Sequence, residues 1–164
     1  MITQIVSFLE RQRLQHHFER VEHYLLANDT STLTLQAKIE RQQHIQHLRE
    51  YRENGIFPRN HTHPERIPCF IDRDGRVCAV GHLLMTSGHS ELAHKIALTD
   101  NNAYVKDMQF PELLNWANDA GLTVDELQAI QPGYSSQLVL SVAASPLTWV
   151  WLIAGSISIL ANVR

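Results

Sequence analysis

Residues 61–84, HTHPERIPCFIDRDGRVCAVGHLL, stand between two long helical segments and a group of shorter ones, and their conformation decides the fold. Within them two apolar runs flank Asp74-Gly75, a dipeptide that suits the positive backbone angles of a tight turn. The pattern predicts a two-stranded β-hairpin at 68–80. Because a two-stranded hairpin is marginally stable alone, we expect it to pack against the helices.

Helical periodicity dominates the chain before this stretch. Four apolar residues spaced four, three and four apart predict one buried stripe on a helix over 2–27. They are Leu14, Phe18, Val21 and Leu25. A second helix is predicted over 33–53, with a weaker stripe made of Leu35, Ile39, Ile45 and Leu48. The two segments predict a long helical hairpin with much polar surface.

Shorter helices are predicted after the hairpin. One covers 81–97 with a break at SGHS, and two more cover 111–120 and 124–131. The last opens with Thr123 and Glu126, spaced as in a capping box. The fold class is therefore mainly α (α+β): a long helical hairpin, a central two-stranded β-hairpin, a cluster of shorter helices and an apolar C-terminal helix.

The composition is that of a globular protein, with 44% hydrophobic and 19% charged residues in 164. Residues 1–106 carry 13 Lys or Arg against 12 Asp or Glu, and from Asp107 onward there are five acids and one base, Arg164. No basic stripe exists to neutralise phosphates, so we expect no nucleic-acid partner.

The C-terminal segment 138–163, LVLSVAASPLTWVWLIAGSISILANV, holds 26 residues without an ionisable side chain. A membrane span needs about 20 predominantly apolar residues, so this segment is a candidate membrane anchor. With no signal peptide at the start, the sequence predicts a single-pass, tail-anchored membrane protein whose domain 1–135 is soluble and cytoplasmic. The alternatives are a buried helix and a homo-oligomer contact through this helix.

Candidate metal ligands gather in the opening stretch. His63, Cys69, Cys78 and His82 form a Cys₂His₂ set, the ligand types of tetrahedral zinc sites, and His61 could replace His63. Eight residues separate the cysteines, unlike the shorter spacing of known zinc motifs. Soft sulfur and imidazole ligands also suit copper or haem iron.

Two alternatives to metal binding remain open. Cys78 precedes a predicted helix and has His82 four residues on, so it is a candidate nucleophile of a thiol-dependent enzyme, with His82 or His63 as base and Asp72 as orienting group. In the second alternative, the cysteines and histidines of this stretch are structural and the chain is a helical adaptor without a ligand. Asp72 and Asp74 are interpreted as turn residues, because the rest of a calcium loop is missing.

The function predicted from the sequence is thus a membrane-tethered small domain that binds zinc, copper or haem through His63, Cys69, Cys78 and His82.

Overall fold

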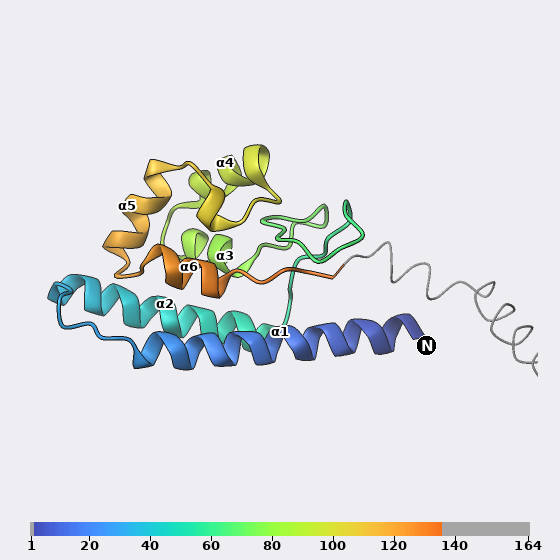
Figure 1. The fold of residues 1–164 in the computed structure, drawn as a ribbon, viewed down its shortest axis with the longest axis horizontal. Coiled ribbons are helices and arrows are strands. Elements are labelled where there is room, and N and C mark those ends of the chain that lie inside the picture. The colour runs from blue at the N-terminus through green and yellow to red at the C-terminus, as the bar shows by residue number, and fades with distance from the viewer. Residues whose placement is uncertain (1, 136–164) are drawn as a thin grey trace, which may run out of the picture.

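The computed structural model describes residues 2–135, and helices make up most of its regular structure (Figure 1). Their bounds are α1 Ile2–Ala27, α2 Leu35–Asn54, α3 Ala79–Thr86, α4 Ser90–Asp100, the 3₁₀-helix η1 Val105–Asp107, α5 Pro111–Asp119 and α6 Val124–Ile130. The two long helices α1 and α2 run side by side as one layer, and the shorter helices form a second layer on top of them (Figure 1). The prediction of a mostly helical chain is confirmed.

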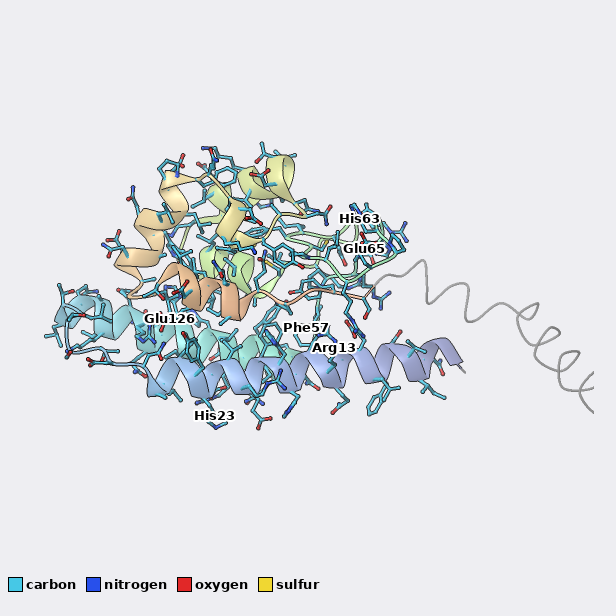
Figure 2. The ribbon with its side chains drawn as sticks, viewed as in Figure 1. Arg13, His23, Phe57, His63, Glu65 and Glu126 are labelled. Carbon is cyan, nitrogen blue, oxygen red and sulfur yellow. The ribbon has the colours of Figure 1, made fainter. Side chains whose placement is uncertain are left out.

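The helical hairpin follows from the sequence, with one change. All four residues of the predicted α1 stripe are buried, and His23 points away from the second layer (Figure 2). In α2, however, Leu35 is 77% exposed and Ile39 45% exposed, so that half of the predicted stripe is wrong. The buried face of α2 begins instead with Ala37 and Arg41 and continues through Ile45 and Leu48.

The predicted central β-hairpin at 68–80 is wrong. Between residues 2 and 135 the structure has no named strand, and the turn holds only an isolated antiparallel bridge between Ile71 and Val77. Asn101, at the end of α4, takes the hydrogen bonds that a further strand would use. Its side chain accepts from the Ile71 N–H (2.8 Å) and donates to the Ile71 carbonyl (3.0 Å), while its carbonyl accepts from the Phe70 N–H (2.8 Å).

The turn is tied closely to α3, because the helix begins immediately after it. Cys78 is the N-cap of α3, with its Sγ accepting the Gly81 N–H at 3.3 Å. A Cβ at Gly81 would lie 2.5 Å from the Val77 side chain and 3.0 Å from the Phe70 ring. Glycine at this position therefore allows the first turn of α3 to pack directly on the preceding turn.

The predicted membrane protein needs correction. Among residues 2–135, no helix combines the length and the apolar character that crossing a membrane requires. The 26-residue α1 is long enough, but charged residues recur along it, among them Glu10, Arg13 and Arg20. On this finding the tail-anchored assignment is not retained. The segment 138–163 itself lies outside the described residues. The same is true of the oligomer contact and the domain boundary that the sequence predicted there.

Candidate metal centre

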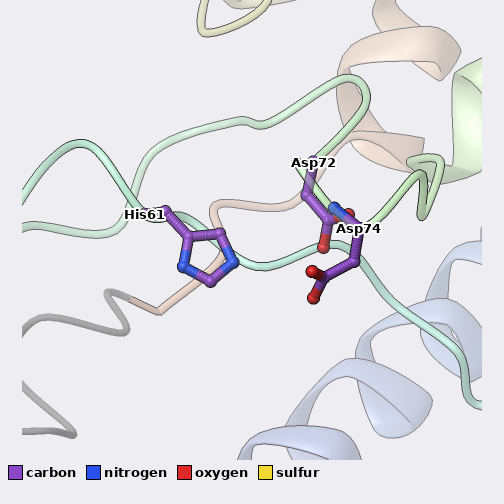
Figure 3. Close-up of side chains that lie close together, drawn as sticks. All are labelled: His61, Asp72 and Asp74. Atoms are coloured by element: carbon purple, nitrogen blue, oxygen red, sulfur yellow. The ribbon is translucent and has the colours of Figure 1, made fainter.

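Three side chains with metal-ligating atoms meet beside the 72–76 turn (Figure 3). His61 comes from the loop that follows α2, and Asp72 and Asp74 come from the turn itself. One ligand atom from each residue lies within 4.8 Å of the other two. These residues form a group that could hold a metal ion.

Asp72 is the fixed member of this group. Its side chain is fully buried, and its Oδ1 accepts the backbone N–H groups of Asp74 and Arg76, each at 2.9 Å. Its Oδ2 accepts the Arg59 N–H at 3.0 Å. These hydrogen bonds build the turn, as expected for an Asp at this place, and they also hold both carboxylate oxygens at set positions between the two loops.

Arg76 is the cation that the group already contains. Its Nη1 lies 2.6 Å from Asp74 Oδ2 and 3.2 Å from Asp72 Oδ2, so one guanidinium nitrogen bridges the two carboxylates. The hydrogen bond from Arg76 lowers the pKa of Asp74 below its ordinary value. Asp74 is therefore a carboxylate at neutral pH, and a metal ion would compete with Arg76 for it.

His61 contributes an unsatisfied nitrogen. Its Nε2 is buried and has no hydrogen-bond partner, and Figure 3 shows one ring nitrogen turned toward the carboxylates. Desolvation, and after it the charge of Arg73, lowers the pKa of His61. The ring is therefore neutral at pH 7 and offers a lone pair, which is the form that binds metals.

The two predicted cysteine ligands are both buried in the hydrophobic core. Cys69 is 4% exposed and lies 3.9 Å from the Asn101 amide, and Cys78 is 1% exposed and caps α3. Burial raises the pKa of Cys69 to about 11 and that of Cys78 to about 12. Both are free thiols that stay protonated at neutral pH, whereas a nucleophilic cysteine must be a thiolate.

The two predicted histidine ligands lie elsewhere. His82 packs against the Tyr51 ring with a centroid distance of 5.1 Å, and His63 is exposed at the outer edge of its loop (Figure 2). The set His63, Cys69, Cys78 and His82 does not form a group of ligand atoms comparable with the one at His61.

Few features of the sequence point to the group of His61, Asp72 and Asp74 that the fold assembles. Asp72 and Asp74 were recognisable as turn residues, and His61 only as a substitute for His63. Ten intervening residues separate His61 from Asp72, without periodicity, so only the path of the loop brings them together.

Comparison of the chain with protein-family models, with curated proteins and with solved structures found no match. What this protein does must therefore be inferred from its own residues.

Proposed function

We propose that this protein binds a divalent metal ion through His61, Asp72 and Asp74, with zinc as the first candidate. The observation that carries the proposal is the buried, unpartnered Nε2 of His61 beside two carboxylates. An unsatisfied buried nitrogen is unfavourable, and a metal ion bound there would satisfy it. The ion would also join the loop after α2 to the 72–76 turn.

The ligand chemistry favours zinc over the other two candidates. Imidazole and carboxylate are zinc ligands, bound at about 2.0–2.2 Å, and three protein ligands leave a fourth position for water. Copper(I) and thiolate-ligated haem need soft sulfur ligands, and neither cysteine belongs to the group of His61, Asp72 and Asp74. The ligand atoms of the three side chains now lie within 4.8 Å of one another, and they must move closer together to bind one zinc ion. Arg76 must also release its hydrogen bond to Asp74.

The test measures zinc affinity in the full chain after treatment with a chelator, by calorimetric titration. His61→Ala and Asp74→Asn should each weaken zinc binding by at least about tenfold, since even residues that only support metal ligands have effects of that size. Arg76→Gln should strengthen it, because the competing cation is removed.

His63→Ala is the matched control. It removes a histidine from the same loop, two residues away, that is exposed and outside the group. It should leave the affinity unchanged, which also controls for weak binding to the other histidines of the chain. Equal losses from His61→Ala and His63→Ala, or a wild-type protein that binds no zinc at micromolar concentrations, would overturn the proposal.

A further inference from the structure

The amino-terminal end of α1 extends past the end of α2 (Figure 1). The last residue of α2, Asn54, lies beside Arg11 of α1, whose Nη2 donates to the Asn54 carbonyl at 3.5 Å. Residues 2–9 of α1 therefore lie beyond α2. Three of their large apolar side chains are exposed, Ile5 by 52% and Phe8 and Leu9 by 59% each.

This end of α1 is uncharged. Residues 2–9, ITQIVSFL, hold no ionisable side chain, whereas charged residues recur along the helix from Glu10 onward. Phe8 and Leu9 follow Ile5 by three and four residues, the spacing of neighbours on a helix surface. Helices in proteins are stabilised mainly by packing of an apolar face, and exposed apolar residues gathered in one place mark an interaction surface. We call Ile5, Phe8 and Leu9 the apolar face of α1.

A pocket of about 340 Å³ adjoins the apolar face of α1. Its walls come from α1, from the loop that follows α2, and from Ser135, the last residue that the structure describes. The apolar part of its lining consists of Phe8, Leu14, Phe57 and Pro58. Phe8 thus belongs both to the pocket and to the exposed face, so that the two form one continuous surface. None of the three residues of the candidate metal centre lines this pocket.

The chain that follows α6 is fastened to α1 at this pocket. The Ser135 N–H donates to Glu10 Oε1 at 3.0 Å, and Arg13 donates to the Gly133 carbonyl at 2.7 Å. The apolar segment 138–163 begins three residues after Ser135. Three residues of chain span at most about 11 Å, so these hydrogen bonds deliver the start of the segment to the pocket and to the apolar face of α1.

We propose that the apolar face of α1 and its pocket are the docking site of this chain's own segment 138–163. The segment holds 26 residues without an ionisable side chain, and burying its apolar side chains against an uncharged helix face removes both surfaces from water. A short tether gives it a local concentration in the millimolar range, which favours it over a second copy at micromolar concentrations. Arg11 and Arg59, exposed in the pocket lining, can keep their guanidinium groups in water while their stems cover the segment.

Photo-cross-linking of the full chain tests the contact. With p-benzoylphenylalanine in place of Phe8, irradiation should link position 8 to residues 138–163 of the same chain, as identified by mass spectrometry of the digest. The same photoprobe in place of Tyr24, which is 42% exposed near the other end of α1, is the matched control and should give no such link. A mixture with ¹⁵N-labelled chains separates the possible occupants. Links that form only between chains would assign the face to a second copy, and either that result or an absence of links to 138–163 would overturn the proposal.

Amide hydrogen exchange of the full chain measures how firmly the segment is held. Leu9→Lys places a charge in the apolar face, so protected amides of 138–163 should exchange about tenfold faster than in the wild type, the effect of losing one leucine from the contact. Leu98→Lys is the matched control, since it makes the same change at an 87% exposed position of α4, and it should have no effect on these amides. Circular dichroism checks that both variants fold. Wild-type amides of 138–163 without protection, or equal acceleration in the two variants, would overturn the proposal.

Discussion

Arg41 of α2 and Glu126 of α6 form a bidentate ion pair inside the protein, and each residue is only 2% exposed. The guanidinium nitrogens lie 2.6 and 2.9 Å from the two carboxylate oxygens. Arg41 also donates to the carbonyls of Gly121 and Leu25, each at 2.7 Å. Glu126, labelled in Figure 2, accepts the Thr123 N–H as well, which completes the predicted capping box of α6. One pair thus joins α1, α2 and α6.

Breaking this pair should destabilise the protein strongly. Arg41→Met leaves a buried carboxylate without its counter-charge, which should lower the free energy of unfolding by about 3–5 kcal/mol. Lys95→Met is the control, since the Lys95–Glu112 pair is half exposed and should contribute less than about 1 kcal/mol. Urea unfolding monitored by circular dichroism measures both. Equal losses in the two variants would show that the buried pair is no stronger than the exposed one.

Gly121 should tolerate no side chain. It has a φ of +65°, and a Cβ there would lie 2.5 Å from the Ala37 carbonyl oxygen of α2. Gly121→Ala must therefore strain the backbone and also push α2 away from the α5–α6 turn. Gly75→Ala is the matched control, with a φ of +78° and no atom within 4 Å of the new Cβ. Gly75→Ala should lose only about 1–2 kcal/mol of stability, the cost of the backbone strain. In thermal unfolding, Gly121→Ala should have a clearly lower Tm than Gly75→Ala.

His44 should make the fold sensitive to mild acid. Its folded pKa of about 4 lies below the ordinary value of 6.5, so the unfolded chain binds more protons between these two pH values. Stability is therefore full above pH 6.5 and falls as the pH drops toward 4. At about 1.4 kcal/mol per pH unit, the loss between pH 7 and pH 5 should be about 2 kcal/mol.

Urea titrations at pH 7 and pH 5 check this expectation. His44→Phe should lose less stability between the two pH values than the wild type, whereas His23→Phe, on the exposed face of α1, controls for the substitution itself. An unchanged difference between pH 7 and pH 5 in His44→Phe would assign the acid sensitivity to other groups.

Both cysteines should resist alkylation in the folded protein. With pKa values raised to about 11 and about 12 and almost no exposure, neither thiol should react with iodoacetamide at pH 8, and both should react in urea. Mass spectrometry of the labelled protein gives the number of alkylated cysteines in each state. Rapid labelling of Cys78 in the folded state would contradict the buried thiol described here and would favour the thiol-dependent enzyme considered from the sequence.

Local sequence patterns predicted the helices because helix formation depends on neighbours three and four residues apart. The Leu14 to Leu25 stripe, the break between α3 and α4, and the Thr123–Glu126 capping box all follow from such spacing. The α2 stripe was half wrong, because Arg41, a charged residue, is buried by pairing with a residue 85 positions away. No periodicity in α2 reveals that partner.

Distant residues decided the turn and the candidate sites. The Asp74-Gly75 turn was visible in the sequence, but the strands around it did not form. The Phe70 N–H donates to the Asn101 carbonyl and the Arg76 N–H donates to the Asp72 side chain, so neither bonds across the turn. The same turn brings Asp72 and Asp74 to His61, and the packing of α2 against α5 places His44 beside Trp116. The sequence by itself determined which segments are helical and where the chain turns, since those properties are local. Only the tertiary structure decided which histidines and carboxylates meet and which cysteines are buried, because these depend on hydrogen bonds and packing between segments far apart in the chain.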